Sequence, residues 1–391
     1  MMRTAMVIAA AMTMIPGSAL AGAGPGPDND IDVAPILGTA TTSAVVIQHS
    51  GGYTYGYNMS GTSVAGQGAL AAVAGYQVQA GGSLGWPDLD GNGISDLVIV
   101  HTSGYQYAYL LQDDGADFVS VLSEGAIPNI PAGSSLLGWA DLDGDGNDDM
   151  ILQDDTTGAT IAHLMSGLTA SSSGAVPGLP DHGGYSTIGF PDLDGNGNAD
   201  IVIQSSSGYA YAYLMSGLSV SSEGPVPSAP DVQGYSTVGF PDLDGDGDAD
   251  IVIQHSGGFA FGYLMSGTTT SSSGPVPGVA GYQIIGFPDL DAQNGSDIVL
   301  QHSGGYTVGF LMAGLTSLSN GALPSLAAAN GYSSIGFPNL DATEGADIVW
   351  QHSGGYTYGY LLDGTSSTGD GALPTAPPGY TTLGWENANA L

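Results

Sequence analysis

Short apolar segments recur along the chain about every fifty residues. Seven of them are rich in Val and Ile and are bounded by Gly and Pro, which predicts β-strands at residues 45–48, 97–100, 150–153, 201–204, 251–254, 298–301 and 348–351. A second marker, Gly followed by Trp or Phe, also occurs seven times, at residues 85–86, 138–139, 189–190, 239–240, 286–287, 336–337 and 384–385. Such a period is typical of propellers or helical arrays, and these short β-type segments favour a propeller.

One repeat reads as four strands. They are predicted at residues 184–190, 201–204, 209–215 and, more weakly, within 218–227. Along the third strand the aromatic residues Tyr209, Tyr211 and Tyr213 alternate with alanine, so large and small side chains lie on opposite faces. Because neighbouring sheets pack face to face about 10 Å apart, we interpret these tyrosines and their counterparts in other repeats as packing between blades.

The two ends of the repeat region are complementary. The first unit begins at its second strand, residues 44–48, and the last stops after its first strand, residues 379–385. Joining them completes one blade and hides the sheet edges. We therefore predict an all-β fold, a seven-bladed β-propeller of four-stranded antiparallel blades over residues 41–391, closed by pairing of the N- and C-terminal segments.

The first 21 residues have the pattern of a secretory signal peptide. Arg3 precedes an apolar run at residues 5–15, and a small-residue cleavage site lies at residues 19–21. That run is too short to span a bilayer. Residues 22–40 are rich in Gly, Pro and Asp and are predicted to be a flexible lead-in. A secreted or extracellular protein is expected, with the periplasm or the cell surface as further options.

Composition narrows the function. The 391 residues include 37 Asp or Glu, one basic residue and no cysteine, giving a formal charge of −36. Nucleic-acid binding needs Lys or Arg opposite the phosphates, and a basic membrane patch needs the same residues. The absence of cysteine excludes disulfides and thiolate metal sites. We expect no nucleic-acid partner and no membrane insertion.

An acidic nonapeptide lies between the first and second strands of the repeats. Oxygen ligands at its positions 1, 3, 5 and 9 and a carbonyl at position 7 suit Ca²⁺, which takes six to eight oxygens in flexible geometry. Four copies are complete: Asp88, Asp90, Asn92, Ile94 and Asp96; Asp141, Asp143, Asp145, Asn147 and Asp149; Asp192, Asp194, Asn196, Asn198 and Asp200; Asp242, Asp244, Asp246, Asp248 and Asp250. Metal-free Asx-turns explain one Asp per turn but not this repeated arrangement.

Two further copies have decayed. One keeps Asp289, Asp291 and Asp297, and the other keeps Asp341 and Asp347. They are either weak ion sites or loops held by side-chain hydrogen bonds. The split blade, with asparagine at 387 and 389, is expected to hold no ion. We predict about four Ca²⁺ ions, with six as the upper limit.

The unit PDLDGDGDADIVIQHSGGFAFGYLMSG, residues 241–267, resembles the FG-GAP/VCBS-type repeats of bacterial secreted proteins and integrin-like propellers. The resemblance covers nearly all of residues 41–391. It implies a seven-bladed propeller with Ca²⁺ in the loops between first and second strands, an architecture shared with integrin-like fungal lectins. Many members carry a basic residue after the second strand, where this chain has Gln or His.

Histidines recur directly after the second strand, on the face predicted to lie opposite the acidic loops. His49, His255, His302 and His352 each stand in Gln-His-Ser-Gly-Gly. They either bind a ligand such as a glycan or cap their own turns, and their repetition argues against a catalytic triad. Isolated acids at 113, 114, 117, 154 and 155 indicate an active site only weakly.

We therefore expect a recognition or adhesion module for a surface glycan or protein, and not an enzyme. A structural subunit of an extracellular coat or filament, formed by self-assembly, is the alternative. A propeller polysaccharide lyase or hydrolase is the less favoured third reading.

Overall fold

The computed structural model describes residues 44–384 apart from 74, 80–85, 113–119, 178–183, 228–233, 294, 327–330, 342, 344 and 378–379. The predictions for the signal peptide (1–21), the lead-in (22–40), the isolated acids at 113, 114 and 117, and the asparagines at 387 and 389 lie outside the described residues. Within the described ranges, no helix is long and apolar enough to cross a membrane.

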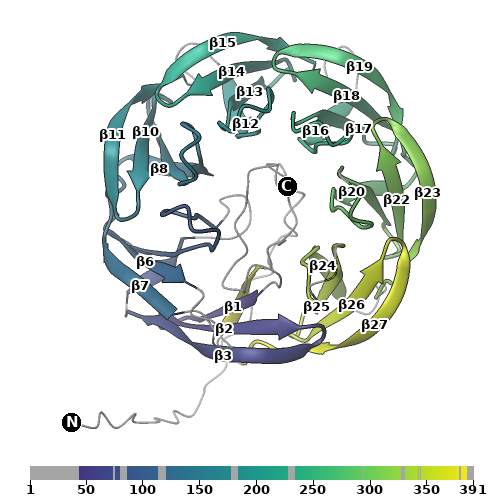
Figure 1. Cartoon of the computed structure of the whole chain (residues 1–391), viewed down its shortest axis with the longest axis horizontal. Coiled ribbons are helices and arrows are strands. Elements are labelled where there is room, and N and C mark those ends of the chain that lie inside the picture. Colours follow the sequence, from purple (N-terminus) through teal and green to yellow (C-terminus); the bar gives the residue numbers. More distant parts are fainter. Residues whose placement is uncertain are drawn as a thin grey trace.

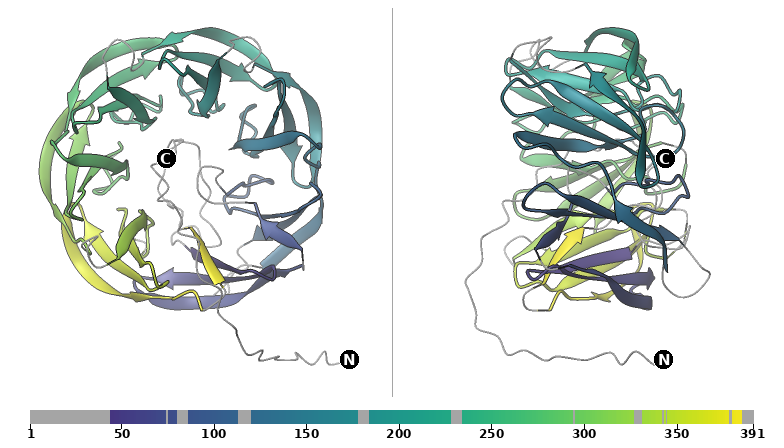
Figure 2. Two further views of the ribbon diagram at one scale, coloured as in Figure 1. Left: turned by 180° about the vertical axis from the view of Figure 1, so that it is seen from behind. Right: turned by 90° about the vertical axis from the view of Figure 1, so that its left-hand side faces the viewer.

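Seven four-stranded antiparallel sheets form a ring, which confirms the predicted seven-bladed all-β propeller (Figure 1). We number the blades by their first strand in the ring. Blade 1 is β28-β1-β2-β3, blade 2 is β4 to β7, and blades 3 to 7 follow in groups of four. The first strand of each blade lies nearest the centre and the fourth forms the rim. In the side view of Figure 2 the strands run between the two faces of the ring.

The strands agree with the segments that the sequence predicts. The first strands are β28 (Tyr380–Gly384), β4 (Tyr76–Val78), β8 (Ser134–Ala140), β12 (Tyr185–Gly189), β16 (Tyr235–Gly239), β20 (Tyr282–Gly286) and β24 (Tyr332–Gly336). The second strands are β1 (Ala44–His49), β5 (Leu97–His101), β9 (Asp149–Asp154), β13 (Ile201–Ser205), β17 (Ile251–His255), β21 (Ile298–His302) and β25 (Ile348–His352).

The remaining strands complete the outer half of each blade. The third strands are β2 (Tyr53–Ser60), β6 (Gln106–Gln112), β10 (Thr160–Ser166), β14 (Ala210–Ser216), β18 (Ala260–Ser266), β22 (Thr307–Ala313) and β26 (Thr357–Asp363). The fourth strands are β3 (Ser63–Ala72), β7 (Ser120–Ala126), β11 (Thr169–Val176), β15 (Ser219–Val226), β19 (Thr269–Val276), β23 (Thr316–Leu323) and β27 (Ser366–Leu373).

The ring closes within blade 1. Strand β28, near the C-terminus, pairs antiparallel with β1, and His49 lies opposite Tyr380 in this register. The two ends of the repeat region therefore share one sheet, as predicted. Closure leaves no blade with an open face, because each sheet packs between two others.

The Gly-aromatic marker is an inter-blade contact. The Phe287 ring of blade 6 lies against Gly239 of blade 5, where a Cβ would be only 2.4 Å from Cε2 of the ring. Phe337 approaches Gly286 in the same way, at 2.5 Å. The glycine makes room for the aromatic residue of the next blade, so the dipeptide recurs as a packing unit.

The third strands confirm only part of the predicted packing. Their small residues are buried, as at Ala108 and Ala212, and Tyr213 is also buried. The interpretation is wrong for the first aromatic residue of these third-strand segments in every blade except blade 3, because more than half of each such residue is exposed. These exposed rings are Tyr53, Tyr105, Tyr209, Phe259, Tyr356 and the corresponding Tyr306 of blade 6.

Candidate metal loops and the opposite face

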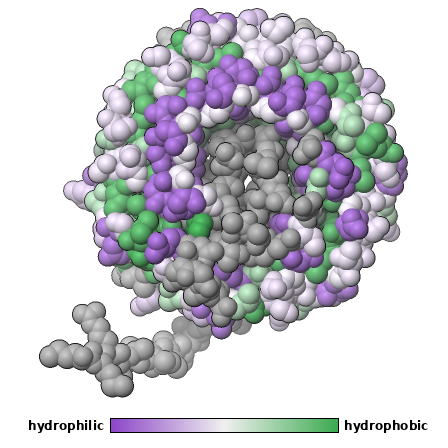
Figure 3. All heavy atoms as spheres, in the orientation of Figure 1, coloured by the Kyte–Doolittle hydropathy of each residue, from purple (hydrophilic) through white to green (hydrophobic). Residues whose placement is uncertain are grey.

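An acidic loop, here called an Asp loop, joins the first strand to the second in blades 2 to 7. Carboxylate oxygens of three residues lie within 4.8 Å of one another in five of these loops. The clusters are Asp88, Asp90 and Asp96; Asp141, Asp143 and Asp149; Asp192, Asp194 and Asp200; Asp242, Asp244 and Asp246; and Asp289, Asp291 and Asp297. Figure 3 shows hydrophilic residues gathered in a ring around the centre of one face. These clusters could hold metal ions.

Position 1 of each complete loop organises the backbone around it. In blade 2, Asp88 accepts hydrogen bonds from the amides of Gly91 (2.9 Å), Asn92 (3.3 Å) and Gly93 (2.8 Å). Gly91 and Gly93 have φ of 67° and 81°, a region that favours glycine. At position 5, Asn92 Oδ1 accepts the amide of Ile94 at 2.8 Å. Burial raises the pKa of Asp88 to about 6.

Position 3 supplies an oxygen that no hydrogen bond satisfies. Oδ1 of Asp90, Asp143 and Asp194 is buried without a donor among the described residues. A buried carboxylate oxygen without a partner is costly, and a bound cation removes that cost. Hard carboxylate and carbonyl oxygens are the ligands that Ca²⁺ prefers. The residues present therefore fit a hard divalent cation.

Position 9 has a structural role that the sequence did not reveal. Asp250 is buried, and its two oxygens accept the amides of Leu243 (2.9 Å) and Met265 (2.8 Å), the latter on β18. The same pair of bonds recurs at Asp96, Asp149, Asp200, Asp297 and Asp347. Burial outweighs these bonds and raises the pKa of Asp250 to about 8. Position 9 thus fastens the loop to the third strand.

Backbone hydrogen bonds link the Asp loops to one another. The amide at position 8 donates to the position 1 carbonyl of the preceding blade, for example from Ala249 to Asp192 at 2.7 Å. The same bond joins Asp148 to Asp88, Ala199 to Asp141, Ser296 to Asp242 and Ala346 to Asp289. The loops of blades 2 to 7 therefore form a connected chain around one face.

A side chain also crosses between loops. Oδ1 of Asp248, at position 7 in blade 5, lies against Gly195 of the blade 4 loop, 2.4 Å from where a Cβ would stand. Burial, Asp246 and the carboxylates of Asp192 and Asp194 raise its pKa to about 6, against a hydrogen bond from Ser266 that lowers it. The sequence indicated only a carbonyl ligand at this position.

The two decayed loops differ from each other. Blade 6 retains a three-carboxylate cluster, and Ala292 has a φ of 57° where the complete loops have glycine. In blade 7, Asn339 Nδ2 donates to the Thr343 carbonyl, and Asp341 Oδ1 accepts the Thr343 amide at 3.1 Å and its hydroxyl at 2.6 Å. Side-chain hydrogen bonds thus hold the blade 7 loop, one of the two outcomes that the sequence left open.

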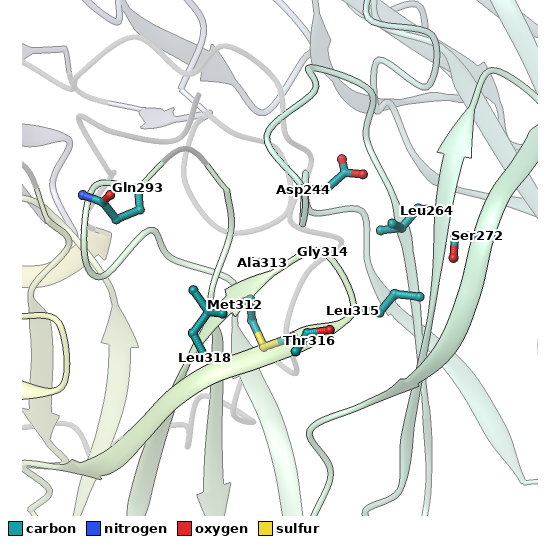
Figure 4. A pocket seen from close by; sticks show the side chains of 10 residues that line it. All are labelled: Asp244, Leu264, Ser272, Gln293, Met312, Ala313, Gly314, Leu315, Thr316 and Leu318. Carbon is teal, nitrogen blue, oxygen red and sulfur yellow. The ribbon is translucent and has the colours of Figure 1, made fainter.

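An open hollow of about 620 Å³ lies where the complete loops meet the decayed ones (Figure 4). Asp244 of the blade 5 loop and Gln293 of the blade 6 loop lie on its sides. Met312, Leu315 and Leu318 of blade 6 supply apolar lining. Its position makes it part of the Asp-loop face and not a separate site.

The recurring histidines lie at the other end of the second strands, on the opposite face. In blade 5, Nδ1 of His255 accepts the Gly257 amide at 2.8 Å, and its ring lies 5.0 Å from that of Tyr235. His49, His302 and His352 make equivalent contacts. Each histidine closes its own turn, while its role toward a ligand stays a prediction.

Comparison with protein-family models gives a match over residues 192–253, to an FG-GAP-like repeat. Together with the seven-bladed fold, this match supports an FG-GAP-type propeller. The matched segment runs from the Asp loop of blade 4 to the second strand of blade 5, so it contains both the loop and the strands that define the repeat. No curated protein matches the sequence.

Several solved structures are similar to this chain over most of its length. A pore structure of the Photorhabdus luminescens Tc holotoxin aligns at 14% identity and a TM-score of 0.48, over 84% of this chain and 17% of the toxin chain. YCF48 from Cyanidioschyzon merolae aligns at 12% identity and a TM-score of 0.43, over 77% of this chain and 88% of the YCF48 chain. Apo AztD from Citrobacter koseri aligns at 8% identity and a TM-score of 0.42, over 88% of this chain and 98% of the AztD chain.

Proposed function

We propose that this propeller is an exported, calcium-binding recognition module for a surface glycan or protein, and that it has no catalytic activity. The observation that carries the proposal is the difference between its faces. One face is a connected chain of acidic loops with buried, unsatisfied oxygens. The other presents the same polar turn with an exposed aromatic ring in most blades. Repetition suits binding of a repetitive surface, whereas catalysis needs one assembled site.

The calcium proposal assigns the ions to the loops of blades 2 to 5. Carboxylates of positions 1, 3 and 9 cluster in blades 2 to 4, and those of positions 1, 3 and 5 cluster in blade 5. In the proposal, the side-chain oxygen of position 5 and the carbonyl oxygen of position 7 complete each site. About four ions are expected, and blade 6, which retains Asp289, Asp291 and Asp297, is the next candidate. A bound ion would neutralise the clustered carboxylates and stiffen a loop that also contacts the next blade.

The residue pattern of the first 21 positions supports the proposal of export, as does the repeat type, since FG-GAP repeats are typical of extracellular proteins. A net charge of −36 and the lack of lysine leave glycans and proteins as the expected partners.

Two measurements test the proposal. Thermal melting of the calcium-depleted chain, repeated with added Ca²⁺, should show a higher midpoint with the ion, because a ligand that binds only the folded state stabilises it. Adhesion of the labelled, calcium-loaded chain to cell surfaces tests recognition. No adhesion, together with ordered self-assembly at high concentration, would favour the coat or filament alternative instead.

A further inference from the structure

Six aromatic rings stand out from the face opposite the Asp loops. They begin or immediately precede the third strand of every blade except blade 3, and between 53% and 66% of each residue is exposed. They are Tyr53, Tyr105, Tyr209, Phe259, Tyr306 and Tyr356. Burying such a ring is favourable, and each is held at a fixed place in a tight turn. We call each ring with its preceding four turn residues an aromatic station.

The stations of blades 1, 5, 6 and 7 share a pre-organised turn that is closed by a histidine. In blade 6, His302 Nδ1 accepts the Gly304 amide at 2.9 Å, and its ring lies 5.0 Å from Tyr282 and 6.3 Å from the exposed Tyr306. The intervening Ser303 is exposed. A ligand on the Tyr306 ring therefore has a hydroxyl and an imidazole edge beside it, without the entropy cost of ordering the turn.

Electrostatics points to a neutral ligand. No station contains a carboxylate, a lysine or an arginine. The turn in blade 3 does carry two acids, Asp154 and Asp155, and there the aromatic residue is replaced by Ala159. Charge and exposed rings are thus kept apart, whereas a site for cations would place carboxylates or several rings around the ligand.

The spacing of the rings also limits the ligand class. Energetic hot spots of protein interfaces cluster in one well-packed centre, but these rings stand singly, one to a blade. An isolated ring with hydroxyl and imidazole groups beside it matches a pyranose, whose C–H face is apolar and whose edge carries hydroxyls. Repeated stations match a polymer of such sugars.

We propose that the aromatic stations are binding subsites for neutral pyranose sugars of an extracellular polysaccharide, which the propeller engages through several blades at once. This proposal rests on the recognition function proposed above and names its ligand class. Single sugars bind weakly at each station, and linkage of several stations raises the apparent affinity for a polymer by about 10²-fold or more.

The test uses the full calcium-loaded chain and an array of neutral hexose oligosaccharides and polysaccharides. A triple variant, Phe259→Ala, Tyr306→Ala and Tyr356→Ala, removes three adjacent stations. The matched control is Leu318→Ala, which removes an exposed apolar side chain (68% exposed) from the rim strand β23. Because all four residues are exposed, melting midpoints should stay within a few degrees of the parent, which verifies folding.

The expected result is polysaccharide binding by the parent and by Leu318→Ala, with at least a tenfold loss in the triple variant. Equal binding by the triple variant would overturn the proposal. Absence of sugar binding in a chain that still adheres to cells would overturn the sugar assignment and leave the recognition function standing. Binding of tetramethylammonium with a loss in the triple variant would instead assign the stations to cations. A chain that neither adheres nor binds sugars would contradict both proposals.

Discussion

The Asp loops of blades 2 to 5 and those of blades 6 and 7 occupy equivalent positions in their blades. They differ in which residues of the nonapeptide motif they retain. Every one of the six retains Asp at position 9 with its two backbone hydrogen bonds, as Asp250 and Asp347 illustrate. In the decayed loops, Gln293 stands at position 5 of blade 6 and Asn339 at position 1 of blade 7, and alanine replaces the glycine of position 4 in both. Position 9 therefore has a structural role in every loop, in addition to its place in the carboxylate clusters of blades 2, 3, 4 and 6 that could hold a cation.

This comparison also explains how the blade 7 loop keeps its conformation with fewer carboxylates at the ligand positions. In blade 7, the side chains of Asn339 and Asp341 bond to Thr343, inside the loop. In blades 2 to 4, the position 3 oxygen has no such donor in the described structure. Hydrogen bonds in one loop thus take the place that a cation would have in the others.

The largest expected effect is on the pH dependence of the calcium-depleted chain. Burial raises the pKa of Asp96, Asp149, Asp200 and Asp250 to about 8, and of Asp297 and Asp347 to about 7. The folded state therefore binds protons more tightly than the unfolded state does. Stability from this source is complete below about pH 4 and is lost as the pH rises to 7 or 8.

Melting curves from pH 4 to pH 8, followed by circular dichroism, measure this effect. Without calcium the midpoint should fall as the pH rises. With calcium it should fall less or rise, because the cation favours the ionised carboxylates in the complete loops. If the melting midpoint depended on pH in the same way with and without calcium, the assignment of the ions to these loops would be contradicted.

Removing the position 9 carboxylate should be the most damaging single change. Asp347→Ala leaves the amides of Leu340 and Leu362 buried without acceptors, at a cost of about 3–5 kcal/mol in the free energy of unfolding. Asp250→Ala should cost a similar amount even with chelator present. Urea denaturation measures both. If Asp347→Ala left the free energy of unfolding unchanged, position 9 would matter only as a metal ligand.

The sequence predicted the strands, the blade count and the ring closure, because period-2 alternation and repeat spacing are local signals. It also predicted the carboxylates of positions 1, 3 and 9, which the structure brings together in four of the loops. It could not find the bond from Asp250 to Met265, since that bond joins the loop to a later strand and forms only in the folded blade. Alternation placed Tyr306 on the packing face but did not reveal that this residue is exposed.

A smaller effect is expected at position 3, and it should depend on calcium. Asp194→Asn removes a ligand charge from the blade 4 loop and should weaken that site roughly tenfold or more. In chelator its stability should equal or exceed that of the parent, because a buried, unpartnered carboxylate oxygen is lost.

Calorimetric titration with Ca²⁺ measures the change at this site. The matched control is Asp341→Asn in blade 7, which should leave the titration unaltered. A loss of calcium affinity in the control as large as in Asp194→Asn would erase the distinction between complete and decayed loops.

The smallest effect is expected where blade 6 keeps the backbone of a complete loop without its glycine. Ala292 adopts a φ of 57°, in the left-handed region where a Cβ is unfavourable by roughly 1 kcal/mol. Ala292→Gly should therefore stabilise the chain by up to that amount, less the entropy that glycine adds to the unfolded state. Gly195→Ala makes the reverse change in blade 4 and should cost more, because its new Cβ would also meet Asp248. If Ala292→Gly also tightened calcium binding, loop geometry and not the Gln293 side chain at position 5 would limit the blade 6 site.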